Sequence, residues 1–99
     1  MKSNSYCGFF INFANKTKMA IVASLIYGPL NTSEIVKIIN EEQSKVSHNL
    51  RKLTHCHILN VKRVGKNRVY SVNEETVVPM LKIVEKHVGH YCKEKRCIK

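Results

Sequence analysis

The sequence has no aspartate, no glycine-rich phosphate loop and no long apolar run. The seven acidic residues are therefore all glutamates, and their spacing shows no pair suited to general acid/base catalysis. Ser47 and His48 are sequence neighbours, which is the wrong geometry for a nucleophile and its base. No stretch of about eighteen apolar residues is present to span a bilayer, and no lipidation motif or basic amphipathic helix points to a membrane surface. We expect neither an enzyme nor a membrane protein.

Positive charge dominates the composition. Lys and Arg number 17 against 7 acidic residues, which gives a formal net charge of +10 and a pI near 9.7. Such a charge favours a polyanionic partner, because each neutralised phosphate releases condensed counterions. No repeat or low-complexity linker divides the chain, so residues 1–99 are expected to form one domain with a modest core. The apolar segment 7–13 is too short for a signal peptide, and we expect a cytoplasmic protein with reduced thiols.

Residues 31–55 show the pattern of two helices joined by a tight turn. Asn31 or Thr32 can cap the first helix, and Asn40 suits the turn because Asn tolerates positive φ. The buried side of this first helix is predicted to carry Ile35, Val36, Ile38 and Ile39. In the second helix, apolar residues at i, i+4 and i+7 can anchor it to a core: Val46, Leu50 and Leu53. Its open face presents side chains that suit base edges and phosphates, namely Gln43, Ser44, Lys45, Ser47, His48, Arg51 and Lys52.

A basic hairpin follows these helices. Strands around 58–64 and 68–73 are joined by Gly65-Lys66-Asn67, a sequence typical of hairpin turns. Between Lys45 and Arg68 the chain carries Lys and Arg but no acidic residue. DNA-contacting residues are predicted on the hairpin as well: Arg63, Lys66, Asn67 and Arg68. The fold class is therefore mainly α with a small β-hairpin wing, a winged helix-turn-helix that binds double-stranded DNA.

Two further helices flank this central part. The first, over 6–13, carries Phe9, Phe10, Ile11 and Phe13, and the last, over 74–92, carries a stripe of Val77, Met80, Leu81, Val84 and Val88. Between them and the central part, Asn15 can cap a second helix with a buried stripe of Met19, Val22, Ala23 and Ile26, ended by Gly28-Pro29. The first and last helices carry more apolar surface than one small core can bury. This surplus predicts a homodimer in which both helices form the interface. Its two DNA-reading helices, about 34 Å apart, would address an imperfect palindromic operator. Alternatively, both helices fold back on their own domain.

Three motifs along residues 14–73 carry a family resemblance. Asn15-x-Thr17-Lys18-Met19-x-Ile21-Val22 is similar to P-T-R-L-x-I-L, Val46-Ser47-His48-Asn49-Leu50-x-x-Leu53 to V-S-H-H-L-x-x-L, and Val69-Tyr70-Ser71-Val72 to V-Y-Y-x-L. These are motifs of the ArsR/SmtB-type repressors, small winged-helix metalloregulators of bacteria and archaea. The resemblance implies a homodimer that represses by occupying its operator and releases DNA when an inducer binds. It also implies major-groove contacts from the helix that begins at Gln43, and backbone or minor-groove contacts from the hairpin.

The resemblance also bears on metals. Where many arsenic, cadmium and lead sensors have L-C-V-C-D-L, this chain has Leu30-Asn31-Thr32-Ser33-Glu34-Ile35, which lacks the thiolates of a soft-metal site. The last-helix ligand pattern of the zinc sensors, shared between two subunits, aligns with Glu74, Thr76, His87 and His90. Threonine is a poor zinc ligand, which weakens that arrangement.

A second arrangement is a zinc site at the carboxyl end, made by some of His87, His90, Cys92 and Cys97. The segment 93–99 is then a cysteine-containing tail. A disulfide or redox switch, and a solvated helix end without metal, are the alternatives. Cys7 can cap the first helix or meet the tail cysteines of a partner subunit. His55 and His57 are interpreted as facing solvent or lying near a phosphate, and Cys56 between them as a small residue that fills space in the packing.

Two functions of different classes follow from the sequence. The first is a sequence-specific DNA-binding transcriptional regulator, a repressor by family resemblance, responsive to a metal or to redox state. The second is an architectural or protein-interaction winged helix that binds nucleic acid weakly and without sequence preference. The ratio of specific to non-specific DNA affinity distinguishes them.

Overall fold

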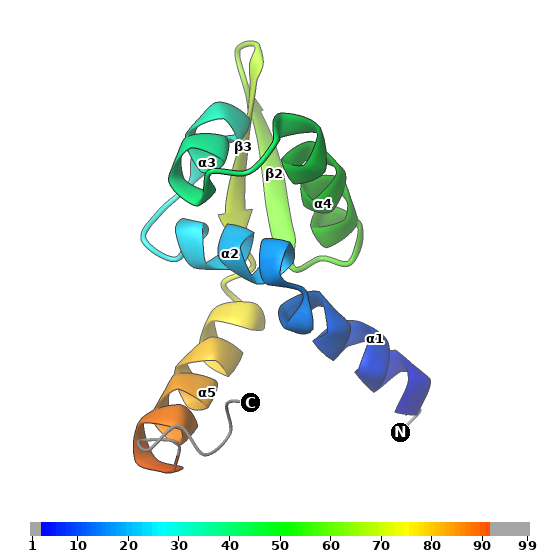
Figure 1. The fold of residues 1–99 in the computed structure, drawn as a ribbon, viewed down its shortest axis with the longest axis vertical. Helices are drawn as coiled ribbons and strands as arrows, with labels where there is room; N and C mark the ends of the chain where they lie inside the picture. Colours follow the sequence, from blue (N-terminus) through cyan, green and yellow to red (C-terminus); the bar gives the residue numbers. More distant parts are fainter. Residues whose placement is uncertain (1–2, 92–99) are drawn as a thin grey trace.

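The computed structural model describes residues 3–91 and contains helices α1 to α5 and strands β1 to β3. Their bounds are α1 Ser3–Ala14, α2 Lys16–Leu25, β1 Leu30–Asn31, α3 Thr32–Ile39, α4 Gln43–His55, β2 Leu59–Val64, β3 Asn67–Val72 and α5 Val77–Tyr91. Figure 1 shows α2, α3 and α4 packed beside the β2–β3 hairpin, whose tip extends beyond them. This is the predicted winged helix-turn-helix, mainly helical with a small sheet.

The hydrophobic core explains why α4 holds its position. Val46, Leu50 and Leu53 are fully buried, as their spacing predicts. They join a cluster that includes residues of α2, α3, both hairpin strands and α5: Ile21, Val22, Leu25, Ile35, Ile58, Leu59, Tyr70, Val72 and Val77. Because one side of α4 is fixed in this cluster, its opposite side must face outward.

Three asparagines define the helix boundaries, as the sequence indicates. The Asn15 side chain accepts a hydrogen bond from the Lys18 backbone N–H (3.0 Å) and caps α2. Asn31 caps α3 in a reciprocal capping box with Glu34, each side chain accepting from the other residue's backbone N–H at 2.9 Å. Asn40 ends α3 in the left-handed conformation (φ 55°, ψ 48°), which turns the chain toward α4.

The predicted buried stripes of α2 and α3 are partly wrong. On α2 the core-facing residues are Thr17, Ile21, Val22 and Leu25, whereas Ala23 is exposed and Ile26 is 52% exposed. On α3, Ile35 is fully buried, but Ile38 is 59% exposed. Both helices carry apolar residues on more than one face, so periodicity alone does not identify the side that packs.

The sheet contains one strand more than predicted. β3 pairs antiparallel with β2 and also with β1, in the order β1-β3-β2. β1 is only two residues long, too short to show strand alternation in sequence. The hairpin turn is also tighter than predicted, because Asn67 pairs with Val64 and belongs to β3, leaving only Gly65 and Lys66 in the turn. Gly65 adopts a φ of 62°, which glycine allows at little cost.

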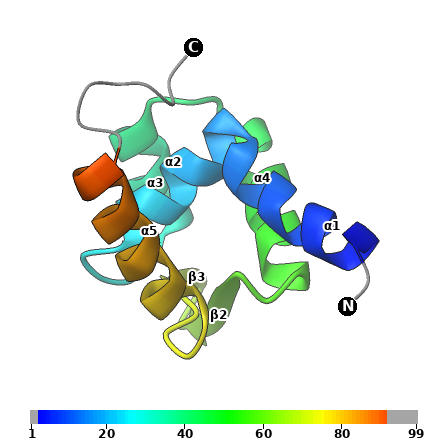
Figure 2. The ribbon, with the colours of Figure 1, turned by 90° about the horizontal axis from the view of Figure 1, so that it is seen from below.

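The first and last helices both leave the central body at the end away from the hairpin tip and diverge from each other (Figures 1 and 2). α1 is longer than predicted, and its Phe10 and Ile11 side chains are exposed. α5 begins at Val77 rather than at the predicted Glu74. The Asn73 side chain accepts hydrogen bonds from the backbone N–H groups of Glu75 (3.0 Å) and Thr76 (3.3 Å), which forms a turn before the helix. Val77 is buried, but Val84 and Val88 are exposed. Over residues 3–91, no helix combines the length and apolar character needed to cross a membrane.

Candidate nucleic-acid interface

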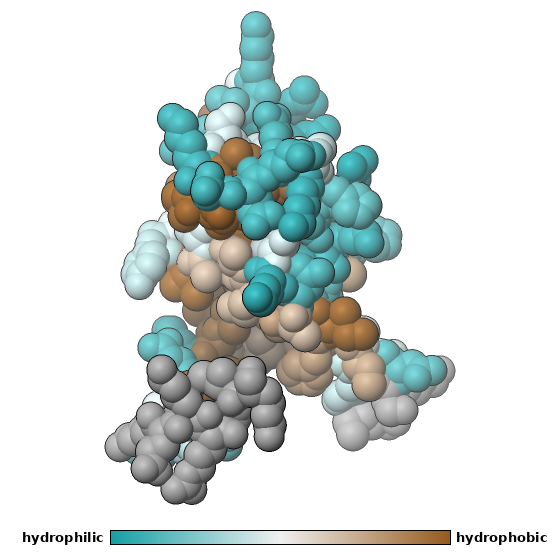
Figure 3. Space-filling model, viewed as in Figure 1, coloured by the Kyte–Doolittle hydropathy of each residue, from teal (hydrophilic) through white to brown (hydrophobic). Residues whose placement is uncertain are grey.

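The outer side of α4 presents the side chains that the sequence predicted. Gln43, Ser44, Lys45, His48, Arg51 and Lys52 are exposed, and Ser47 is half-buried. Two of them already have local partners: the Ser44 hydroxyl donates to the Glu42 carboxylate (2.6 Å), and Lys45 forms an ion pair with Glu41 (2.9 Å). The remaining polar side chains of this face keep their hydrogen-bonding capacity for a ligand. Figure 3 shows that hydrophilic residues cover this part of the molecule, over α4 and the hairpin tip.

The hairpin presents a second cationic surface. Arg63 and Arg68 are directly opposite each other in the β2–β3 register. Like charges placed opposite on antiparallel strands destabilise a hairpin, so this pair has a cost to folding that an anion would offset. Alternation along the strands puts Val61 and Tyr70 on the same side as the two arginines. Lys66 lies at the turn and Asn67 follows it, both exposed.

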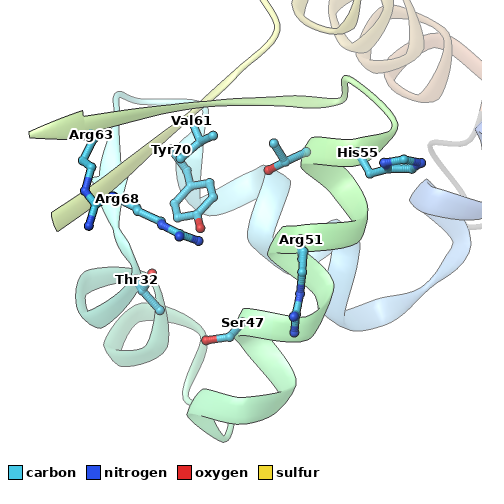
Figure 4. Close-up of a pocket in the computed structure, with 9 residues that line it drawn as sticks. Thr32, Ser47, Arg51, His55, Val61, Arg63, Arg68 and Tyr70 are labelled. Atoms are coloured by element: carbon cyan, nitrogen blue, oxygen red, sulfur yellow. The ribbon is translucent and has the colours of Figure 1, made fainter.

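A cleft of about 790 Å³ separates α4 from the hairpin. Figure 4 shows Arg68 directed into it from the hairpin, with Arg63 at its edge and Arg51 lying along α4. The other residues lining the cleft are Thr32, Ser47, Thr54, His55, Val61 and Tyr70. No described residue that lines it is acidic. The arrangement can bind an anion between two secondary-structure elements, because three guanidinium groups reach the same space.

The structure brings together only some of the predicted DNA-contacting residues. Ser47, Arg51, Arg63 and Arg68 line the cleft, whereas His48 and Lys52 line only a neighbouring groove between α4, α1 and the start of α2. That groove shares Arg51 and His55 with the cleft. Lys52 therefore faces α1 and not the wing. Cys56 is exposed, so its interpretation as a small filler is wrong.

Tyr70, Thr32 and Thr54 are cleft residues that sequence reasoning did not single out. The signal for Tyr70 was its position two residues after Arg68 on a predicted strand, which puts both on one face. Thr32 was considered only as a helix cap. Thr54 uses its hydroxyl to donate to the Leu50 carbonyl (2.8 Å), which leaves it no proton to donate to an anion.

The predicted metal ligands are partly within the described chain. His87 and His90 are exposed on α5, and the His87 ring packs against the ring of Tyr91 with centroids 4.8 Å apart. Glu74 precedes α5, and His87 lies ten residues after the first residue of that helix, about 15 Å along its axis at a rise of about 1.5 Å per residue. Cys92 and Cys97 lie outside the described residues. Over residues 3–91, no group of three or more His, Cys, Asp or Glu side chains has the arrangement of a metal site.

Comparisons with known proteins agree with this geometry. Residues 15–61 match the family described as bacterial regulatory protein, arsR family. The HTH-type transcriptional regulator NmtR of Mycobacterium tuberculosis is 32% identical over 77 residues, which are 78% of this chain and 64% of NmtR. The chain thus spans slightly less than two thirds of that relative.

Solved structures show the same fold at low sequence identity. M. tuberculosis Rv0081 superposes with a TM-score of 0.85 at 18% identity, covering 94% of each chain. The transcriptional repressor BigR from Xylella fastidiosa superposes with a TM-score of 0.74 at 19% identity, covering 91% of this chain and 89% of BigR. What these structures share with this chain is the arrangement of the helices and the hairpin. That arrangement positions the cleft and the outer side of α4.

Proposed function

We propose that this winged helix-turn-helix protein is a regulator of the ArsR/SmtB type, which acts on transcription by binding duplex DNA in a sequence-specific manner. One observation carries the proposal: the apolar side of α4 is fully buried while its polar side is open beside an arginine-lined cleft. A helix held in this way can enter a major groove with its side chains at base edges. The hairpin then lies over the adjacent backbone and minor groove.

Within this proposal the contacts have two roles. Gln43, Ser47 and His48 hydrogen-bond base edges and give sequence preference, as do Ser44 and Lys45 once they leave their glutamate partners. Phosphate contacts come from cationic and polar residues that carry no sequence information by themselves: Arg51, Lys52, Arg63, Lys66, Asn67 and Arg68. The phosphate contacts supply most of the affinity and its dependence on salt.

The proposed form is a homodimer joined through α1 and α5. Both helices leave the body at the end away from the hairpin tip and carry exposed apolar residues, among them Phe10, Ile11, Val84 and Val88. A second copy is the partner that symmetry supplies for such surfaces, and it doubles the DNA contacts on an imperfect palindrome. We propose that the dimer acts as a repressor, since an operator occupied by it is closed to other proteins.

The test is a selection from random-sequence duplexes, followed by affinity measurements at physiological salt. A regulator should prefer the selected duplex over a scrambled one by at least about 10³. Arg68→Ala should weaken binding to both duplexes and lower the salt slope by about one unit, because one phosphate contact is lost. Lys16→Ala removes an exposed charge outside the lining of the cleft and should leave the slope unchanged. A wild-type ratio near one would exclude sequence-specific regulation.

The same selection decides the alternative function. The bonds of Ser44 to Glu42 and of Lys45 to Glu41 favour an architectural winged helix, because both base-reading side chains are already occupied. Such a protein would bind every duplex with similar affinity and keep the strong salt dependence. Gln43→Ala would then change no sequence preference.

For regulation we propose a borderline metal such as zinc, bound through the α5 imidazoles of His87 and His90. Neutral imidazole is a common zinc ligand, and two histidines three residues apart share a helix face. The remaining ligands would come from Cys92 and Cys97 or from Glu74 of the second subunit. Metal analysis of untagged protein, followed by a DNA-binding titration with zinc and chelator, tests this. A metal-free protein whose DNA affinity does not respond to zinc would exclude metal regulation and leave redox control through the cysteines to be tested.

A further inference from the structure

The cleft between α4 and the hairpin lies where a DNA backbone has to pass, if the proposed function is correct. A helix in the major groove and a hairpin in the neighbouring minor groove are separated by one sugar–phosphate strand. In this chain the space between those two elements is the arginine-lined cleft. We infer that this cleft holds the backbone strand, and that the Tyr70 hydroxyl, with Arg51 and Arg68, binds one of its phosphates.

Tyr70 combines a fixed ring with a free hydroxyl. The residue is 7% exposed, and its ring belongs to the hydrophobic core. Within residues 3–91, every buried side-chain polar atom has a partner, and no hydrogen bond there involves the Tyr70 hydroxyl. The hydroxyl is therefore open to the cleft, and Figure 4 shows it directed into the space that Arg51 and Arg68 share. A donor held by core packing loses little conformational entropy when it binds.

The charges around the hydroxyl select an anion. Arg51, Arg63 and Arg68 line the cleft from α4 and from both strands of the hairpin, and the described residues of its lining include no carboxylate to pair with them. Guanidinium groups match phosphate oxygens with two parallel hydrogen bonds. The direct opposition of Arg63 and Arg68 in the hairpin, unfavourable in the free protein, becomes favourable once a phosphate lies between α4 and the strands.

Polar and cationic residues continue beyond the cleft along the surface. This continuation favours an extended polyanion as the ligand over a single small anion. A second hollow of about 230 Å³ shares Thr32 and Arg68 with the cleft. Its other lining residues are Asn31, Ser33, Lys66 and Asn67, which connect the start of α3 to the hairpin turn. Polar and cationic groups thus continue from α4 to the tip of the wing. Successive phosphates of one strand can occupy such a path, whereas free phosphate would need only one position.

Tyr70→Phe tests the inference without removing charge or core volume. For a random-sequence duplex, we expect its affinity to fall by about tenfold, the loss of one hydrogen bond to a charged group, with the salt slope unchanged. Arg51→Gln should weaken binding and also lower the slope by about one unit. Tyr27→Phe, at a tyrosine that is 98% exposed and outside the cleft, is the matched control and should bind as wild type. Thermal unfolding should confirm that Tyr70→Phe keeps its fold, because the hydroxyl has no partner to lose.

The outcomes separate the inference from the function on which it rests. If wild-type protein binds DNA and Tyr70→Phe binds equally well, the inference is overturned and the proposed function stands. If wild-type protein binds no duplex at any salt concentration, both are overturned. A titration with inorganic phosphate, followed by backbone amide NMR, distinguishes the source of the anion. Weak, unsaturated shifts in the cleft that DNA abolishes support a backbone site, whereas tight saturable phosphate binding that Tyr70→Phe removes without changing DNA affinity would overturn it.

Discussion

A carboxylate introduced on α5 by Val84→Glu tests the proposed homodimer. Val84 is 45% exposed in the single chain, so the substitution should cost the isolated fold little, and Glu has a higher helix propensity than Val. Complete burial of such a side chain is worth about 1.5–3 kcal/mol, so covering its exposed part contributes about 1 kcal/mol per subunit. Two-fold symmetry doubles this to about 2 kcal/mol, which corresponds to a dissociation constant raised about thirtyfold. Desolvation of the two carboxylates adds to that loss.

Sedimentation equilibrium over a range of protein concentrations measures the dissociation constant directly. Tyr27→Glu is the matched control, because Tyr27 is 98% exposed and lies outside α1 and α5. Helicity measured by circular dichroism should be the same in both variants and in wild type. Val84→Glu protein that dimerises like wild type, or a Tyr27→Glu protein that dissociates equally, would refute the assignment of the interface to α5.

Three further substitutions test the frame of the site. Leu50→Ala removes a fully buried side chain of α4 and should lower the free energy of unfolding by about 2–5 kcal/mol. Urea titrations measure this loss, and a value below about 1 kcal/mol would contradict the described core. Asn31→Ala removes the capping box with Glu34 and should cost about 0.5–2 kcal/mol, whereas Ser33→Ala, at an exposed neighbour, should cost much less. Asn40→Gly should change the free energy of unfolding little, whereas Asn40→Ala should lower it by about 1 kcal/mol, because alanine disfavours the left-handed conformation. Equal stability of the two variants in thermal unfolding would exclude that conformation at residue 40.

The parts of the fold that were predictable from sequence depend on local chemistry. The spacing of Val46, Leu50 and Leu53 identified both the α4 helix and its buried side. Asn31 and Asn40 marked the ends of α3 because their side chains suit caps and left-handed turns. The hairpin followed from Gly65 and the polar turn between two β-rich segments. None of these features requires knowledge of distant residues.

The parts that sequence did not predict depend on how elements pack together. The exposure of Ile38 follows from the side of α3 that meets α4, and periodicity did not reveal that side. The direction of Lys52 depends on the position of α1, with which it lines a groove. The position of Tyr70 two residues after Arg68 puts both on one face of the strand, but only the register with β2 sets them beside Val61 and Arg63. Pairing across strands is a long-range property, so a single sequence leaves it open.

Under the proposed function, the short strand β1 has a consequence for the kind of DNA duplex that the chain can bind. Asn31 pairs with Val69 in the sheet and also caps α3, so one residue ties the wing to the helix-turn-helix unit. The wing therefore cannot swing independently of α3 without breaking either the pairing of β1 with β3 or the cap of α3. A duplex bound by α4 and the wing together must adapt its own groove width to a fixed separation. Base steps that deform easily would then be preferred even at positions that no side chain reaches.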